Sequence, residues 1–189
     1  MPDSSELLIA RPILGLKRPL VLVGLMGAGK STVGRRLAKI IDRRFVDSDE
    51  EIERAAACSI SDIFQLHGEP IFRDLEQRVI YRLLEEDGLV LATGGGAWIQ
   101  PAIRERIKEK AVSVWLRADI HVLIERVERR NNRPLLENGD KRAILQRLMD
   151  ERYPLYAQAD ITIDSGDGPH EQIVEQIVEA VTDYVKVKA

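Results

Sequence analysis

The chain has 189 residues, of which 44% are hydrophobic and 31% are charged, and its net charge is -3. This length allows one domain to bury a core of its own, whereas two full domains would be cramped. Apolar runs all fall short of the roughly 20 residues that a membrane helix requires, so we expect no membrane partner. Basic residues are dispersed among acidic ones, unlike the basic patch of a nucleic-acid-binding protein.

The first residues differ from a secretory signal. Residues 1–17 carry Asp3 and Glu6 where such a signal would be basic, and proline and basic residues interrupt the apolar stretch. Within the rest of the chain, no repeat, low-complexity tract or linker suggests a second domain. We therefore expect a poorly ordered leader over 1–17, one domain over 18–189, and a cytoplasmic protein.

Short apolar runs of strand length alternate with longer helical patterns. Runs of this kind, separated by helices, indicate a parallel sheet that is covered on both faces. Right-handed crossovers then make the sheet doubly wound, so we predict an α/β fold with five parallel strands flanked by helices. The predicted strands are LVLV (20–23), RFVD (44–47), LVLA (89–92), VSVWL (112–116) and DITID (160–164).

Residues typical of helix ends mark both ends of the helix predicted over EPIFRDLEQRVIYRLLEE. Pro70 fits its first turn, and Gly88 follows its last residues. Apolar residues recur at every fourth position, so we expect this face to lie along the core. These apolar positions are Ile71, Leu75, Val79 and Leu83.

The segment GLMGAGKST (24–32) lies between the first predicted strand and a helical pattern. Its first eight residues match GxxxxGK[ST] in the strand–turn–helix context that this motif requires. Glycines let backbone N–H groups converge on phosphate oxygens, while Lys30 can reach the terminal phosphates and Ser31 a magnesium ion. A turn needed only for packing would not require lysine and serine in succession. The sequence therefore predicts a phosphate site. The motif alone does not show whether the bound nucleotide drives motion, carries a signal or donates a phosphoryl group.

Two further segments follow predicted strands. In VDSDEEI, Asp47 and Asp49 would face the same side of an extended chain, at the strand end where open α/β sheets bind ligands. One carboxylate would support magnesium and the other would orient or deprotonate an acceptor hydroxyl. Alternatively, Asp47 only ends the strand and Asp49 caps the next helix.

In TGGGA, which follows the third predicted strand, three glycines indicate either close approach of the backbone to a ligand or neighbouring element, or a plain tight turn.

Three arginines are candidates for binding an anion. Arg73 and Glu76 are three residues apart in a predicted helix, where a surface ion pair is the default interpretation. Arg133 lies in the polar, turn-rich segment 126–140, which is typical of a mobile loop. Arg152 closes the following helix and would interact favourably with its dipole. Each of these side chains could instead be merely solvated.

Taken in order, seven segments closely resemble shikimate kinases over about residues 19–182. They are GLMGAGKST, VDSDEEI, SISDIF, GEPIFRDLE, ATGGGA, NRPLL and ERYPLY. The resemblance implies a P-loop kinase fold with a mobile lid at about 126–140, and transfer of the γ-phosphoryl group of ATP to the 3-hydroxyl of shikimate, on the route to chorismate and the aromatic amino acids. It also implies ATP as co-substrate and one Mg²⁺ ion per subunit. We expect a monomer, because one core accounts for the apolar residues.

The resemblance also implies roles for single residues. Asp49 would hold the hydroxyls of shikimate and act as base, while Lys30 and the lid residue Arg133 would stabilise the transferring phosphate. The metal residues would be Ser31 and Asp47. The residues expected to bind ATP are Gly27, Ala28, Gly29, Lys30, Ser31, Thr32, Arg126, which packs on adenine, and Arg133. Those expected to bind shikimate are Asp49, Arg73, Gly94, Gly95, Gly96, Arg152, Phe64 and Phe72, with the two arginines clasping its carboxylate.

Two alternatives stay open at this point. A related P-loop kinase acting on gluconate would share the core, but it would not need two arginines aimed at a carboxylate beside a polyol site. A catalytically silent nucleotide-binding module that regulates a partner would be expected to lack the acceptor residues. Asp49, Arg73, Arg133 and Arg152 are all present, which favours the kinase.

Overall fold

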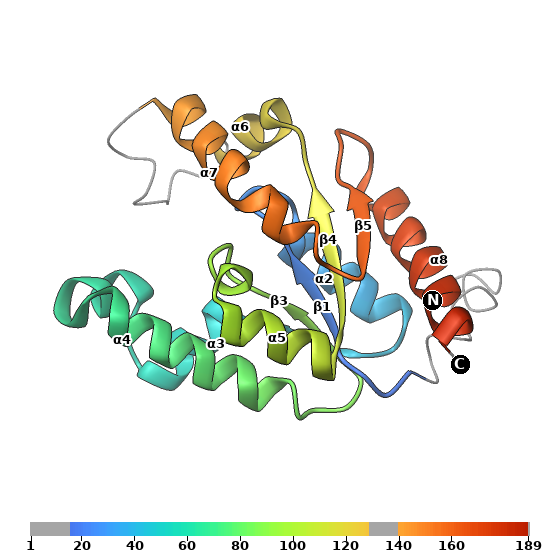
Figure 1. Cartoon of the computed structure of the whole chain (residues 1–189), viewed down its shortest axis with the longest axis horizontal. Coiled ribbons are helices and arrows are strands. Elements are labelled where there is room, and N and C mark those ends of the chain that lie inside the picture. The colour runs from blue at the N-terminus through green and yellow to red at the C-terminus, as the bar shows by residue number, and fades with distance from the viewer. Residues whose placement is uncertain (1–15, 129–139, 189) are drawn as a thin grey trace.

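The structure, a computed structural model, describes residues 16–128 and 140–188, and a parallel sheet lies at its centre (Figure 1). The strand order is β2-β3-β1-β4-β5, and every neighbouring pair is parallel. The predicted five-stranded sheet is confirmed, with boundaries that differ by one residue at the end of β4 and the start of β5. The strands are β1 (Leu20–Val23), β2 (Arg44–Asp47), β3 (Leu89–Ala92), β4 (Val112–Arg117) and β5 (Ile161–Asp164).

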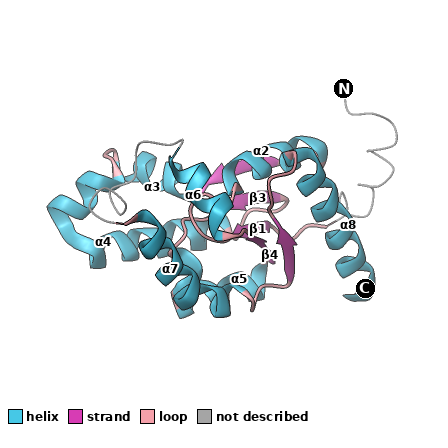
Figure 2. Ribbon diagram, turned by 90° about the horizontal axis from the view of Figure 1, so that it is seen from above, coloured by secondary structure: helices cyan, strands magenta, loops and turns pink. Residues whose placement is uncertain are grey.

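Helices cover the sheet on both faces, as the alternation of patterns predicts. Helices α2 and α8 contact each other, and in Figure 2 α2 lies on the opposite side of the strands from α5 and α7. Strands β1 and β3 are buried along their whole length, which explains their continuous runs of aliphatic residues. The helices are α2 (Lys30–Ile40), α3 (Ser48–Ala56), α4 (Ile60–Leu83), α5 (Pro101–Lys110), α6 (Ile120–Glu128), α7 (Lys141–Tyr156) and α8 (His170–Lys188), with a 3-10 turn η1 (Ala97–Ile99).

Helix α4 consists of two parts that meet at Gly68, whose φ of 79° and ψ of 174° are not helical. Pro70 lies in the first turn of the second part, as predicted. The prediction that Ile71 lies along the core is wrong, because Ile71 is 48% exposed while the adjacent Phe72 is buried. This end of α4 projects beyond the sheet (Figure 1), so Ile71 can face solvent there, although Ile63 and Phe72 of the same end are still part of the buried cluster.

The predicted lid and leader fall largely outside the described residues. Helix α6 continues to Glu128, so Arg126 is helical and the loop begins later than residue 126, where it was predicted to start. Residues 129–139, which include Arg133, and residues 1–15 are not described. Leu16 packs against the core at the end of the described part of the leader. Over 16–128 and 140–188, no helix is long and apolar enough to span a membrane.

Candidate active site

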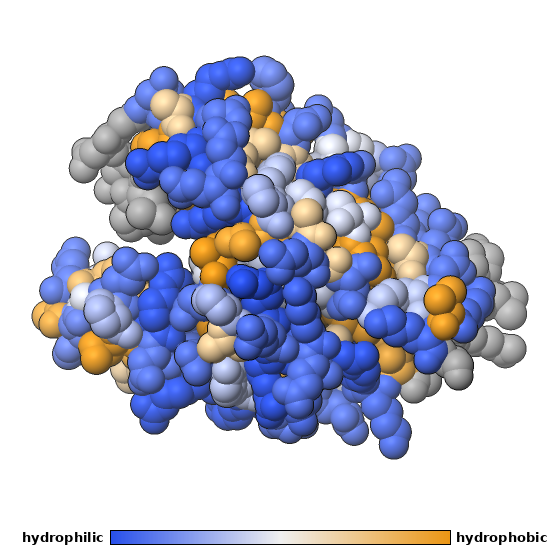
Figure 3. All heavy atoms as spheres, viewed as in Figure 1, coloured by the Kyte–Doolittle hydropathy of each residue, from blue (hydrophilic) through white to orange (hydrophobic). Residues whose placement is uncertain are grey.

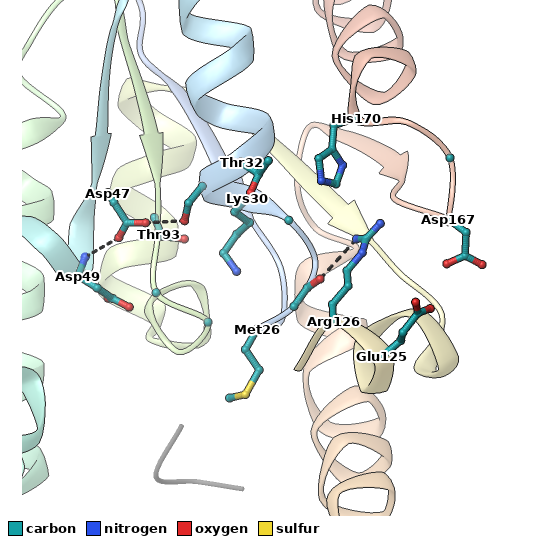
Figure 4. A pocket seen from close by; sticks show the side chains of 16 residues that line it. Met26, Lys30, Thr32, Asp47, Asp49, Thr93, Glu125, Arg126, Asp167 and His170 are labelled. Atoms are coloured by element: carbon teal, nitrogen blue, oxygen red, sulfur yellow. Dashed lines mark hydrogen bonds between the residues drawn. The ribbon is translucent and has the colours of Figure 1, made fainter. Parts of the chain in front are cut away.

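A cavity of about 430 Å³ lies at the carboxyl edge of the sheet, where open α/β sheets bind ligands (Figure 4). In the space-filling view, a hollow separates the part that carries α6 and α7 from the part that carries α4 (Figure 3). The cavity-lining residues that the sequence predicted for the site are Gly27, Gly29, Lys30, Ser31, Thr32, Asp47, Asp49, Gly94, Gly95 and Arg126. Those that it did not predict are Met26, Thr93, Glu125, Asp167, Gly168 and His170.

The turn between β1 and α2 forms one wall of the cavity. Gly29 is the N-cap of α2 with φ 91°, a left-handed conformation that glycine adopts without a Cβ penalty. Lys30 begins the helix, and its ammonium group donates to the carbonyl oxygens of Gly24 at 2.7 Å and Leu25 at 2.9 Å. Backbone N–H groups at the start of a helix, together with a lysine held over the turn, make a site for phosphate.

Asp47 connects this turn to the next strand. Its Oδ2 accepts a 2.6 Å hydrogen bond from the Ser31 hydroxyl, and its Oδ1 accepts one of 3.0 Å from the backbone N–H of Asp49. Asp47, not Asp49, is therefore the N-cap of α3. Asp49 lies in the first helical turn and not in extended chain, yet both carboxylates line the same cavity, as Figure 4 shows.

The glycine triplet after β3 lets three side chains approach the backbone closely. A Cβ on Gly94 would lie 2.6 Å from Oδ1 of Asp49, and a Cβ on Gly96 would lie 2.7 Å from Nη1 of Arg73. The carbonyl of Gly95, between them, accepts a 3.2 Å hydrogen bond from Arg152. These contacts exceed what a plain tight turn would need, and they bring side chains from α3, α4 and α7 to one short segment.

Arg73 is held by a buried carboxylate. Its Nη1 donates at 2.7 Å to Glu76, and Gln100 donates to the same carboxylate at 2.6 Å. The default interpretation of a surface ion pair is wrong, because Glu76 is only 1% exposed. Burial raises the pKa of Glu76 and nearby Asp49 raises it further, whereas the hydrogen bond and charge of Arg73 lower it; the net shift is upward.

The remaining predicted substrate residues lie beside the cavity and not in its lining. The rings of Phe64 and Phe72 are 4.6 Å apart, and the guanidinium of Arg73 lies 5.1 Å from the Phe72 ring centre. Arg152 shares its acceptor, the Gly95 carbonyl, with the hydroxyl of the fully buried Tyr156. A ligand that reached from the cavity to both arginines would therefore pass along the glycine triplet.

Arg126 forms the far wall of the cavity. It donates to the Ser165 hydroxyl at 3.0 Å and to the carbonyl of Gly166 at 2.5 Å, so it ties α6 to the loop that precedes α8. Arg133, the arginine predicted for the lid, lies outside the described residues, as does most of the predicted lid.

Comparison with known proteins decides the family. The sequence profile of the shikimate kinase family matches residues 26–182. This chain belongs to the shikimate kinase family. The shikimate kinase of Rhodopseudomonas palustris is 55% identical to it over 184 residues, which are 97% of this chain and 89% of that one.

Superposition on solved structures supports the same family. The shikimate kinase of Acinetobacter baumannii, solved in complex with shikimate, superposes with a TM-score of 0.86 at 38% identity, over 92% of this chain and 97% of that one. A gluconokinase of Sinorhizobium meliloti superposes with a TM-score of 0.56 at 18% identity, over 91% and 95% of the two chains. The second likeness concerns the fold alone. The fold is thus shared, while sequence similarity places the chain with the shikimate kinases.

A signal for the missed cavity residues was present in the sequence. Asp167, Gly168 and His170 follow β5, and the carboxyl ends of all parallel strands meet at one edge of the sheet. The rule that pointed to the segments after β2 and β3 applies equally to the segment after β5. Glu125 precedes the predicted Arg126 in α6, and Thr93 and Met26 lie in motifs that were recognised for their neighbours.

Proposed function

We propose that this chain transfers the γ-phosphoryl group of ATP to the 3-hydroxyl of shikimate, which gives shikimate 3-phosphate and ADP. The observation that carries the proposal is the meeting of Asp49, Arg152 and Arg73 along Gly94–Gly96. This segment also lies against the phosphate turn, since a Cβ on Gly95 would be 3.5 Å from the backbone nitrogen of Met26. Acceptor groups and phosphate groups therefore share one site.

The two arginines suit a carboxylate ligand. Guanidinium groups bind carboxylates through paired, charge-assisted hydrogen bonds that fix the orientation of the ligand. Arg73 comes from α4 and Arg152 from α7, two helices on either side of the hollow in the space-filling view (Figure 3). With its carboxylate held there, shikimate would turn its ring hydroxyls towards the glycine backbone and Asp49.

The transfer step requires positioning and a proton acceptor. The oxygen of the 3-hydroxyl forms a bond to the γ-phosphorus, the bond from that phosphorus to the β,γ-bridging oxygen breaks, and the hydroxyl proton passes to the carboxylate of Asp49. Lys30 and the backbone N–H groups at the start of α2 hold the β- and γ-phosphates as charge moves to the ADP oxygen. Arg133, from the lid, would add positive charge at the transferred group.

The residues that are present fit a magnesium ion. The Ser31 hydroxyl and the Asp47 carboxylate are hard oxygen donors 2.6 Å apart beside the phosphate turn. Within 16–128 and 140–188, no cluster of three acidic, histidine or cysteine side chains offers an all-protein metal site. This suits Mg²⁺, which is usually bound through one or two protein groups together with substrate phosphates and water. When bound, the ion offsets the negative charge of the phosphates.

Product analysis tests this proposal. The protein is incubated with ATP, MgCl₂ and shikimate, and the product is followed by phosphorus and proton NMR. We expect a monophosphate ester at the 3-position, formed in equal amount with ADP. A phosphate ester at another position, or ADP formed without an ester, would contradict the proposed acceptor.

A further inference from the structure

Three consecutive residues at the end of β2 direct their side chains to different partners. Asp47 accepts from the Ser31 hydroxyl, whereas Asp49 lines the cavity (Figure 4). Ser48, between them, is fully buried, and its Oγ accepts a 3.0 Å hydrogen bond from the backbone N–H of Gly94. The residue that separates the two aspartates therefore joins α3 to the glycine triplet.

The Ser48 hydroxyl takes the place of a strand acceptor. Strand β2 pairs with β3 as far as Asp47, which lies opposite Ala92, and the chain becomes helical at Ser48. The N–H of Gly94, two residues beyond this last pair, therefore needs an acceptor other than a carbonyl of β2. Backbone N–H groups that are withdrawn from water are almost always paired. Here the acceptor is the side chain of the first residue of α3.

The carbonyl groups of the glycine triplet are held as well. Gly94 and Gly96 accept from backbone N–H groups of η1 at 3.1 and 3.2 Å, and Gly95 accepts from Arg152 of α7 at 3.2 Å. These bonds fix the shape of the segment and its position against α7. The bond from Gly94 to Ser48 fixes its position against α3, the helix that carries Asp49.

This contact lies directly beside the groups proposed to hold the acceptor alcohol. A Cβ on Gly94 would lie 2.6 Å from Oδ1 of Asp49, so this carboxylate packs against the backbone that Ser48 holds. Asp49 and Gly94 both line the cavity, whereas Ser48 is not among the lining residues. Any effect of Ser48 on a bound substrate would therefore pass through these two neighbours.

We propose that Ser48 is a positioning residue for phosphoryl transfer, which sets Asp49 and the glycine triplet at the distance that the acceptor alcohol requires. This inference rests on the proposed kinase function and assigns a role to a residue outside the cavity. A shift of about 1 Å in a reacting group can lower a rate roughly 100-fold, so such a contact can control turnover. The turn before α2 holds the phosphates, so we expect nucleotide binding to be independent of Ser48.

Kinetics and calorimetry of Ser48→Ala test this inference. The variant removes the acceptor of the Gly94 N–H, and its kcat with shikimate should fall at least roughly tenfold. One hydrogen bond contributes on the order of 1 kcal/mol, so shikimate binding should weaken roughly fivefold while the affinity for ATP stays within about twofold. Ser48→Thr keeps a hydroxyl and should recover most of the turnover.

Ser113→Ala is the matched control. Ser113 is also fully buried, and its hydroxyl donates to Asp160 at 2.7 Å, near the opposite edge of the sheet. The control should lower the melting temperature but leave kcat and shikimate affinity unchanged, and a merely structural role of Ser48 would give the same result in Ser48→Ala. Ser48→Cys, whose thiol is only a weak hydrogen-bond acceptor, should resemble Ser48→Ala without leaving a cavity.

Three results would overturn the inference. The first is wild-type kcat and shikimate affinity in Ser48→Ala or Ser48→Cys, whatever their melting temperatures. The second is an equal loss of ATP and shikimate affinity, which would indicate a general disturbance of the site. The third is a turnover in Ser48→Thr as low as in Ser48→Ala, at the melting temperature of the wild type. Failure of the wild type to phosphorylate shikimate is a separate outcome, which would contradict the proposed function itself.

Discussion

Arg73 donates a 2.7 Å hydrogen bond to Glu76, a carboxylate that is only 1% exposed. Burying a carboxylate is costly, and the upward shift of its pKa reflects that cost. In return, Glu76 holds the guanidinium of Arg73 in place, because Glu76 is itself held by a hydrogen bond from Gln100. Arg73 thus lies beside Gly96 in one orientation before a substrate arrives.

Arg73→Ala should weaken the binding of shikimate by about 2–5 kcal/mol, the usual cost of removing one partner of a buried charge pair. Binding of ATP should stay close to that of the wild type, because no phosphate group meets Arg73. Calorimetric titration with each ligand measures both effects. Arg78→Ala is the matched control, since Arg78 pairs with Asp74 on the same helix at 73% exposure. An unchanged dissociation constant for shikimate would remove Arg73 from the site.

Asp49→Asn should lower turnover by about 10²- to 10⁴-fold, the usual contribution of a positioned acid or base. The affinity for ATP should be nearly intact, because the carboxylate meets the acceptor hydroxyl and not the nucleotide. Steady-state kinetics with both substrates varied separates the two effects. Glu50→Gln serves as control, because this neighbour is half-exposed and pairs with Arg35 at the surface. Near-normal turnover of Asp49→Asn would refute its role as base.

Gly96→Ala should impair substrate binding with little loss of stability. The backbone of Gly96, at φ -95° and ψ -14°, accommodates alanine, but the added Cβ would lie 2.7 Å from the guanidinium of Arg73. Displacing the guanidinium from this position should weaken shikimate binding at least roughly tenfold, which corresponds to about 1.4 kcal/mol.

Gly166→Ala provides the comparison for Gly96→Ala, because nothing lies within 4 Å of a Cβ at Gly166. Thermal melts and shikimate titrations of the two variants belong together. Normal shikimate affinity in Gly96→Ala would show that the position of Arg73 does not matter for binding.

The sheet was predictable because its strands carry their own signals. Strands that are buried on both faces need continuous runs of aliphatic residues, and β1 and β3 begin and end where those runs do. The face of α4 was less predictable, since periodicity does not reveal where a helix leaves the sheet. Ile71 fits the pattern but lies in the projecting turn after Gly68.

The site was predictable residue by residue only in part. The phosphate turn has a local motif, so it could be recognised without a structure. The burial of Glu76 could not be predicted from the sequence, because an arginine and a glutamate three residues apart give the same pattern in a buried helix and in a solvent-exposed one. Likewise, Asp47 and Asp49 were both expected in extended chain, but only Asp47 is extended; the helix begins at Ser48, and both carboxylates still line the cavity.

Lowering the pH should reduce the free energy of unfolding, because it protonates the carboxylate of Asp160. Burial raises the pKa of Asp160, but hydrogen bonds from Tyr184 and from the backbone and hydroxyl of Ser113 outweigh it, so the pKa is lowered overall. A carboxyl with a lowered pKa stabilises the fold above its unfolded pKa, about 3.9, and this stabilisation is lost as the pH falls through the folded pKa.

Urea unfolding of the wild type and of Asp160→Asn, from neutral to acidic pH, measures this effect. The wild type should have the higher free energy of unfolding at neutral pH, and the difference should shrink as the pH falls below the ordinary carboxyl pKa. Asp183→Asn is a suitable control, because Asp183 is exposed and pairs only weakly with Lys186 at 3.4 Å. A difference for Asp160→Asn that is the same at every pH would contradict the assigned role of its charge.

The central claim is that one site joins a triphosphate to a ring alcohol whose carboxylate is held by Arg73 and Arg152. The most direct measurement is ADP release with ATP and MgCl₂ in the presence of shikimate, shikimate methyl ester or gluconate. We predict rapid release with shikimate, much slower release with the ester, and only background release with gluconate. Equal rates with shikimate and its ester, or release with gluconate but not with shikimate, would contradict the account.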